Sequence, residues 1–219
     1  MTTRHIGADE SGKGDYFGYL VIAGVVVDDE SEKKLREIGV KDSKMLSDSV
    51  VTKLSAAVKR TCGESKFNVV RISPEKYNTL QKKFKNLNAL LAWGHAQVIE
   101  NLLQKNNVDY IIVDKFADEK YMNDALAEKE KRGKIKQKVK LIQNIRGESD
   151  VAVAAASIIA RTEFLRTLKQ LSMEVGYSLP KGATHVEEAA RELVKKYDES
   201  VLNFTAKKHF KTTKRVLGK

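Results

Sequence analysis

The sequence predicts an α/β protein: a mixed five-stranded central sheet flanked by helices, with a helical C-terminal extension from about residue 180. Short β-branched runs alternate with segments whose apolar residues keep helical spacing. The chain has 219 residues, of which 42% are hydrophobic, so it can bury a substantial core. No internal repeat or Pro/Gly/Ser-rich linker divides it. We therefore expect one domain over residues 1–219, extension included.

Elements of the N-terminal half follow from β-branched runs and helix-start signals. The β-branched run of residues 17–27 is bounded by Gly and Asp, which predicts a strand. We expect this strand to form a hairpin with the short segment at residues 4–10. Ser47 is a suitable cap for one helix, and Ser73 before Pro74 favours the start of another. Strands are expected over residues 4–10, 17–27 and 67–72, and helices over residues 48–60 and 86–105.

Elements of the C-terminal half include a short buried strand that ends in Asp114. Alternation predicts a further strand over 134–142, with Lys134, Lys136, Lys138 and Lys140 on its exposed face. The run from Val151 is apolar all round and rich in alanine, which is typical of a central buried helix. The expected strands cover 108–114 and 134–142, and the expected helices cover 118–131, 151–174 and about 184–197.

The charge balance favours a polyanionic partner. Forty Lys and Arg against 29 Asp and Glu give a net charge of +11. Residues 207–219 carry six Lys or Arg and no acid. A positive field of this size attracts nucleic acid, although a solvated basic surface is the alternative interpretation.

Several classes are excluded or disfavoured. The longest uncharged apolar stretch, from Tyr16 to Val27, is shorter than the ~20 residues of a membrane span, and early acids exclude a secretory signal. The lone Cys62 indicates a reducing compartment, so we expect a cytoplasmic protein without membrane contact. The four histidines lack zinc-site spacing and are expected in packing or on the surface.

Residues 7–14 carry the first candidate site. Gly7, Gly12 and Lys13 satisfy a phosphate-loop pattern, but Gly14 stands where Ser or Thr belongs. Two carboxylates inside the loop would also repel phosphates. The alternatives are that Asp9 and Glu10 bind metal, or that they belong to a solvated turn.

Other acids could complete a metal site. Asp114 closes an apolar strand, where open α/β sheets place functional groups, although such acids also cap helices. Glu148 and Asp150 precede the apolar helix and are either caps or further ligands. Converging carboxylates repel one another unless cations are bound, and all-oxygen ligands select Mg²⁺ or Mn²⁺.

Four segments that span nearly the whole chain form a pattern when taken together. They are Gly7-Ala8-Asp9-Glu10-Ser11-Gly12-Lys13-Gly14-Asp15-Tyr16-Phe17-Gly18, Asp42-Ser43-Lys44-Met45-Leu46, Val113-Asp114-Lys115-Phe116-Ala117, and Glu148 followed by Ala152 to Arg161. In order and spacing these segments resemble the type 2 ribonuclease H family, and they are more similar to ribonuclease HIII than to ribonuclease HII.

The resemblance implies a ribonuclease H fold and an endonuclease that cuts the RNA strand of RNA–DNA hybrids. It implies that two Mg²⁺ or Mn²⁺ ions support hydrolysis that leaves 5′-phosphate and 3′-hydroxyl ends. The backbone of the substrate-binding motif would contact the ribose 2′-OH. By motif matching, the metal-binding catalytic acids are Asp9, Glu10, Asp114 and Glu148, with Asp150 as a substitute for Glu148, and the substrate-binding motif is Gly12, Lys13 and Gly14.

The resemblance covers the catalytic domain. Ribonuclease HIII enzymes commonly carry an N-terminal substrate-binding domain, and Met1 lies only eight residues before Asp9. Hybrid binding is therefore expected to depend on the catalytic domain, with Lys134 to Lys140 and residues 207–219 as candidates for the electrostatic attraction. We expect a monomer. The alternatives are incision at single ribonucleotides in duplex DNA, as ribonuclease HII performs, and a non-catalytic hybrid-binding protein.

Overall fold

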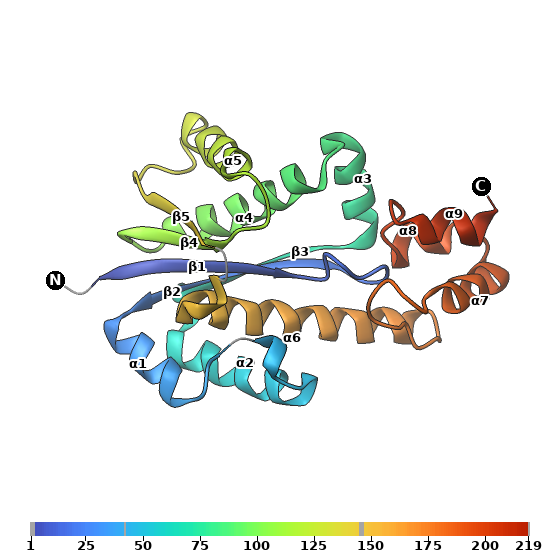
Figure 1. Ribbon diagram of the computed structural model, residues 1–219, viewed down its shortest axis with the longest axis horizontal. Helices are drawn as coiled ribbons and strands as arrows, with labels where there is room; N and C mark the ends of the chain where they lie inside the picture. Colours follow the sequence, from blue (N-terminus) through green and yellow to red (C-terminus); the bar gives the residue numbers. More distant parts are fainter. Residues whose placement is uncertain (1–2, 42, 145–146, 219) are drawn as a thin grey trace. The chain divides into compact units, whose positions relative to one another are not determined.

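The computed structural model describes residues 3–41, 43–144 and 147–218 (Figure 1). A five-stranded sheet has the order β3-β2-β1-β4-β5. The β1–β4 and β4–β5 pairs are parallel. The strands are β1 (Arg4–Ser11), β2 (Leu20–Asp28), β3 (Phe67–Ile72), β4 (Tyr110–Asp114) and β5 (Lys140–Asn144). The expected five-stranded α/β fold is confirmed.

Helices account for most of the remaining chain. Several begin where the sequence offers a side-chain cap, since Ser47 accepts from the backbone of α2 and Ser73 from that of α3. The α-helices are α1 (Asp29–Glu37), α2 (Asp48–Cys62), α3 (Pro74–Phe84), α4 (Leu87–Leu103), α5 (Glu119–Lys131), α6 (Val151–Glu174), α7 (Glu187–Tyr197), α8 (Val201–Thr205) and α9 (Lys211–Leu217). The short 3₁₀ helices of the described residues are η1 (Ser43–Met45), η2 (Glu64–Lys66) and η3 (Gly147–Ser149).

The contacts of the chain divide it into two compact units. The first comprises Met1–Glu10, Ile22–Val70 and Asn86–Thr162 and contains most of the sheet. The second comprises Ser11–Val21, Arg71–Lys85 and Glu163–Lys219 and contains the helical C-terminal extension. The expectation of a single domain stays a prediction. No helix in the described residues is long and apolar enough to cross a membrane.

In the first unit, helices cover both faces of the sheet, with α4 and α5 on one side and α1, α2 and the start of α6 on the other (Figure 1). Two glycines allow this close packing. A Cβ on Gly7 of β1 would lie 2.2 Å from the backbone nitrogen of Val153 in α6. A Cβ on Gly24 of β2 would lie 2.5 Å from the side chain of Val98 in α4. Every residue from Val151 to Ala160 except Ser157 is buried, as the apolar pattern predicts.

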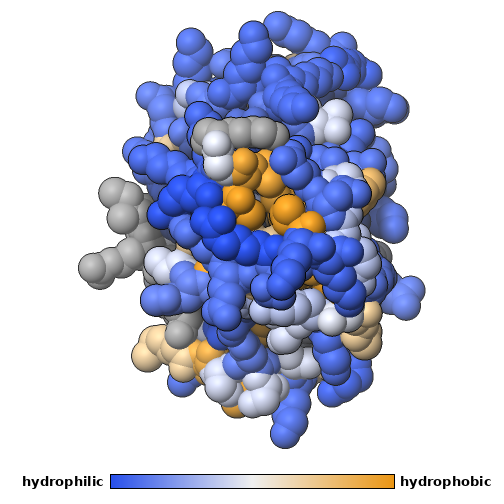
Figure 2. All heavy atoms as spheres, turned by 90° about the vertical axis from the view of Figure 1, so that its right-hand side faces the viewer, coloured by the Kyte–Doolittle hydropathy of each residue, from blue (hydrophilic) through white to orange (hydrophobic). Residues whose placement is uncertain are grey.

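In the second unit, α7 and α9 lie on a face whose surface is mostly hydrophilic around a small group of hydrophobic residues (Figure 2). The cations of α9, Lys211, Lys214 and Arg215, are exposed, as is Lys208. Lys207 is instead fully buried. The prediction that residues 207–219 form a basic surface is therefore wrong for Lys207, whose ammonium binds backbone carbonyl oxygens.

The prediction of a strand over 134–142 is wrong for residues 134–139, because β5 begins at Lys140. The β4–β5 pairing begins at Tyr110 and Lys140, so residues before Lys140 lie opposite no strand residue. The alternation nevertheless survives as a pattern of exposure. Ile135 is buried, whereas the lysines at 134, 136, 138 and 140 are exposed.

Two element starts also differ from the prediction. The second strand begins at Leu20 rather than at residue 17, because Gly18 has a φ of 85° and Phe17 forms an isolated bridge with Ala206. The helix expected from about 184 begins at Glu187, because His185 has a φ of 56°. Both angles lie in the left-handed region, which interrupts regular structure.

Candidate active site

Acidic side chains from neighbouring strands lie at the carboxyl edge of the sheet. The β1–β4 register pairs Ala8 with Val113, so the next residues, Asp9 and Asp114, follow neighbouring positions on parallel strands. Glu10 follows Asp9 in β1. All three acids are only partly buried. The tertiary structure thus brings together acids that lie 105 residues apart in the sequence.

Asp9 carries the clearest electrostatic signature. Burial raises the pKa of its carboxyl group to about 6, and the neighbouring Glu10 carboxylate acts in the same direction. Ser157 of α6 opposes this shift through a hydrogen bond to the carboxylate. Negative charge at Asp9 is therefore costly in the absence of a cation.

Ser157 links Asp9 to the segment that carries Ser43. The Oγ atoms of Ser43 and Ser157 are 2.8 Å apart. Arg161, one turn along α6, donates to the backbone carbonyl of Ser43 and to Asp48 Oδ1. The Asp-Ser-Lys segment of the sequence is thus held beside the acids through Ser43, while Asp42 and the side chain of Lys44 lie outside the described residues.

Glu10 contacts a histidine that the sequence pattern did not indicate. His95 of α4 is fully buried, and its Nε2 lies 3.0 Å from Glu10 Oε2. Its ring stacks on Phe116, with centroids 5.3 Å apart. Among the described residues, Nδ1 has no hydrogen-bond partner. Because a protonated Nδ1 would be a buried donor without an acceptor, we assign the hydrogen to Nε2, which donates to Glu10.

Asp114 lies at the end of β4, where its Oδ1 accepts a hydrogen bond of 2.9 Å from the backbone nitrogen of Gly147. Gly147 begins η3 and approaches so closely that a Cβ there would lie 2.9 Å from Asp114 Cα. The backbone of Glu148 follows within η3, but its side chain lies outside the described residues. Its role as fourth acid stays a prediction.

Asp150, the expected substitute for Glu148, is used by the fold. Its Oδ1 accepts hydrogen bonds of 2.9 and 3.1 Å from the backbone nitrogens of Ala152 and Val153 at the start of α6. Its carboxylate also lies 3.1 Å from Nε2 of His5. Although burial would raise the pKa of Asp150, these hydrogen bonds lower it. The structure thus supports the helix-cap interpretation of Asp150.

The acids fit a hard divalent cation by their chemistry. They offer oxygen ligands only, and a cation would offset the burial and the repulsion by Glu10 that together raise the pKa of Asp9. As the described side chains stand, no group of three His, Cys, Asp or Glu is close enough together to hold a metal ion. The side chain of Glu148 lies outside this described set.

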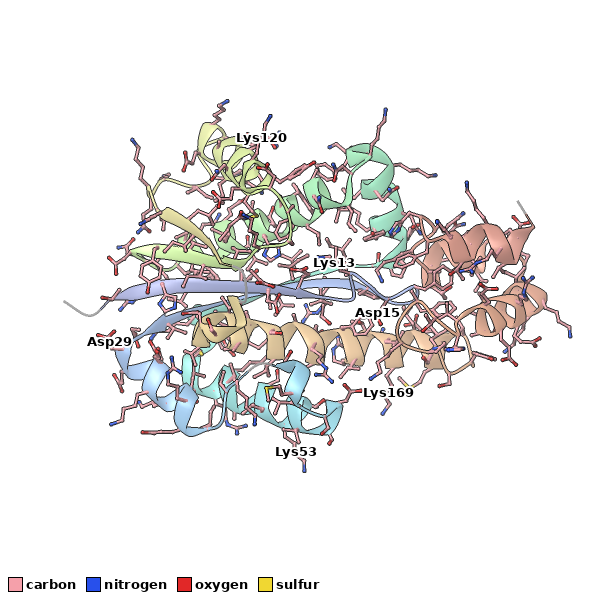
Figure 3. The ribbon with its side chains drawn as sticks, in the orientation of Figure 1. Lys13, Asp15, Asp29, Lys53, Lys120 and Lys169 are labelled. Carbon is pink, nitrogen blue, oxygen red and sulfur yellow. The ribbon has the colours of Figure 1, made fainter. Side chains whose placement is uncertain are left out.

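The motif Gly12, Lys13 and Gly14 lies in the second unit, in the loop after β1, where Figure 3 labels Lys13 and Asp15. Gly12 has a φ of 87°, and a Cβ there would lie 2.2 Å from the carbonyl oxygen of Tyr19. Gly14 is exposed, and in the described part of the chain no atom beyond its two chain neighbours lies within 4 Å of where its Cβ would be. The motif therefore presents backbone without side-chain cover at Gly14, as a loop that contacts a ligand closely requires.

A mixed sheet with acids at the carboxyl edge of β1 and β4, backed by α6 and α4, defines a nuclease of the ribonuclease H type. A family model described as Ribonuclease HII matches residues 6–213. The chain is 47% identical to the Ribonuclease HIII of Protochlamydia amoebophila, and the match covers 99% of this chain and 69% of that protein.

Solved structures agree with this comparison. A crystal structure of Bst-RNase HIII in complex with Mn²⁺ matches with a TM-score of 0.88 and 33% identity, covering 99% of this chain and 70% of that one. The ribonuclease H2 of Pyrococcus horikoshii, at 24% identity and a TM-score of 0.81, shares the fold and covers 98% of this chain and 97% of that one. The chain belongs to the type 2 ribonuclease H family, and it resembles the ribonuclease HIII members. It is a nuclease.

Proposed function

We propose that this protein cleaves the RNA strand of RNA–DNA hybrids by hydrolysis that depends on Mg²⁺ or Mn²⁺. The observation that carries the proposal is that Asp9 and Asp114 follow paired positions at the carboxyl ends of neighbouring parallel strands, with Glu10 next to Asp9 in β1, in a chain of this family. Asp9, Glu10, Asp114 and Glu148 would hold two divalent ions. When bound, such ions would lower the pKa of the attacking water and neutralise charge on the leaving 3′ oxygen; because the bond between phosphorus and that oxygen breaks, the products would carry 5′-phosphate and 3′-hydroxyl ends.

The chain's own residues orient these acids. Ser157 donates to Asp9, His95 donates to Glu10, and the backbone of Gly147 donates to Asp114. Hydrogen bonds of this kind fix the carboxylates that bind a metal. In the second unit, the backbone of Gly12, Lys13 and Gly14 would contact the 2′-OH that distinguishes RNA from DNA. The exposed lysines at 134, 136, 138 and 140 would attract the phosphate backbone.

The decisive experiment offers three labelled duplexes to the protein with Mg²⁺ or Mn²⁺. They are a continuous RNA–DNA hybrid, a DNA duplex with one embedded ribonucleotide, and an all-DNA duplex. Preferential cutting of the hybrid supports the proposal. Comparable cutting of the single-ribonucleotide duplex indicates ribonuclease HII-type specificity, and binding of the hybrid without cleavage in either metal contradicts the catalytic proposal.

Asp9→Asn is expected to stabilise the metal-free protein at pH 8. Because the pKa of Asp9 is about 6 in the folded protein against an ordinary 3.8, the folded state binds more protons than the unfolded state between these values. The free energy of unfolding therefore falls as pH rises through this window. Asparagine does not ionise, so the variant avoids this decrease in the free energy of unfolding. In EDTA at pH 8, the variant should unfold at a temperature a few degrees higher than the wild type. At pH 4 the two unfolding temperatures should differ little.

The same Asp9→Asn variant should lose the stabilisation that added Mg²⁺ confers on the wild type, because a ligand that binds only the folded state raises its stability. A lower unfolding temperature than the wild type in EDTA at pH 8 would contradict the electrostatic assignment. An undiminished response to Mg²⁺ would remove Asp9 from the metal site.

His95→Phe is expected to reduce kcat/KM by about tenfold to a hundredfold and to raise the Mg²⁺ concentration needed for half-maximal rate. Phenylalanine keeps a ring against Phe116 but cannot donate to Glu10. His95→Gln is the matched control, since its amide can still donate toward Glu10, and it should lose less activity. If both variants lose activity equally and have equal urea midpoints, the hydrogen bond to Glu10 is not the cause of the lost activity.

A further inference from the structure

Lys207 is a buried cation whose ammonium binds backbone oxygens. Its exposed fraction is 0%, and its Nζ donates to the carbonyl oxygens of Asp15 at 2.9 Å and Gly18 at 2.7 Å, with Phe17 O at 3.4 Å. Burial lowers the pKa of Lys207 to about 7, although the charge of Asp15 opposes this. Burying an ammonium is costly, so the position calls for an explanation.

All of these carbonyl oxygens belong to the loop that carries Gly12, Lys13 and Gly14. The backbone of residues 205–207 makes further contacts with the same loop. The nitrogen of Lys207 donates to Tyr16 O at 2.8 Å, and the nitrogen of Gly18 donates to Thr205 O at 2.9 Å. Phe17 and Ala206 form an antiparallel bridge. The loop therefore pairs with a segment that lies about 190 residues away in the sequence.

A second segment holds the loop through Asp15 and Tyr16. The nitrogen of Gly182 donates to Asp15 Oδ1 at 2.6 Å, and the nitrogen of Tyr16 donates to Gly182 O at 2.8 Å. Gly14 is exposed, by contrast, and Asp15 N donates back to Gly12 O at 3.3 Å. The conformation of residues 12–14 thus depends on how residues 15–18 are held.

We infer that Lys207 is a positioning residue for ribose recognition: by binding the carbonyl oxygens of Asp15 and Gly18, its ammonium holds the loop so that Gly12, Lys13 and Gly14 can contact the RNA strand. The inference rests on the proposed function, in which this motif binds the 2′-OH. Several carbonyls that point at one place need a donor there, since unpaired buried carbonyls cost free energy. A lysine supplies one group with three donor hydrogens.

The test is equilibrium binding in an Asp114→Asn background, which prevents cleavage of the probe. Lys207→Met is compared with Lys169→Met, which removes the same charge from an exposed position on α6 in the same unit, labelled in Figure 3. Fluorescence anisotropy measures Kd for a labelled RNA–DNA hybrid and for an all-DNA duplex of the same sequence. Lys207→Met should raise Kd for the hybrid about tenfold and leave Kd for DNA within about twofold, whereas Lys169→Met should shift both equally and slightly.

A merely structural role would lower the fraction of protein that binds, seen as stoichiometry in a titration, without changing the ratio of the two Kd values. Unchanged hybrid preference in folded Lys207→Met would overturn the inference. If circular dichroism shows Lys207→Met to be unfolded, Lys207→Gln is used instead. Its shorter, uncharged side chain offers two donor hydrogens in place of three, so it should weaken hybrid binding by at least about threefold, and no weakening overturns the inference. Cleavage of the hybrid by the wild-type protein is measured in parallel. If the wild type does not cleave the hybrid, the proposed function is contradicted. The ratio of the two Kd values decides the role of Lys207 independently of that result.

Discussion

Asp114→Asn is expected to reduce cleavage of an RNA–DNA hybrid by at least about a hundredfold while leaving hybrid binding within about twofold. Asparagine keeps an oxygen that can accept from the nitrogen of Gly147, so the junction between β4 and η3 is preserved. It removes the negative charge that a divalent cation would need. The loss should therefore appear in kcat, measured in single-turnover cleavage at saturating protein.

Asp109→Asn is the matched control, because Asp109 lies just before the other end of β4 and accepts from the backbone nitrogen of Arg4 at 2.8 Å. The same change of charge there should leave cleavage within about twofold. Cleavage by Asp114→Asn at the wild-type rate would remove Asp114 from the mechanism. A comparable loss in both variants would indicate a general effect of charge instead of a role at the site.

Gly7→Ala is expected to destabilise the protein by about 3 kcal/mol or more. The added Cβ would lie 2.2 Å from the nitrogen of Val153 and 2.3 Å from the carbonyl carbon of Ala152. Both atoms are backbone, so no side chain can rotate away, and α6 must move off the sheet. Urea denaturation should show a lower midpoint, and cleavage should fall as well because Asp9 follows Gly7 by two residues in β1.

Gly14→Ala provides the control for stability, since among the described residues only its two chain neighbours could lie within 4 Å of its added Cβ. Its urea midpoint should stay close to that of the wild type. A Gly7→Ala variant as stable as Gly14→Ala would mean that α6 does not pack on β1 at Gly7 as closely as the structure has it.

Features that depend on neighbouring residues were predicted well from the sequence. The all-round apolar run from Val151 forms the buried part of α6, and Ser47 and Ser73 cap the helices that follow them. The failures came where a segment depends on a distant partner. Residues 134–139 alternate in exposure like a strand, yet β4 is too short to pair with them.

The candidate site likewise contains residues that the sequence predicts and contacts that it does not. The sequence predicts Asp9, Glu10 and Asp114 as site residues, because acids beside glycines and at a strand end are unusual and match a family pattern. Three contacting residues were missed: His95, Ser157 and Lys207. A buried histidine or a partly buried serine has no local sequence signal that shows which acid it contacts, and a lysine in a basic tail is indistinguishable from its exposed neighbours.

The sequence by itself determined the fold class, the chemistry of the acids and the family, since these depend on residue types, local periodicity and motif order. Only the tertiary structure decided which groups orient those acids and where the basic residues lie. His95 meets Glu10 across 85 residues, and Lys207 meets the loop at Asp15 across 192 residues. Such contacts depend on how strands pair and helices pack, because these bring distant side chains to one place and decide which charges lose their water.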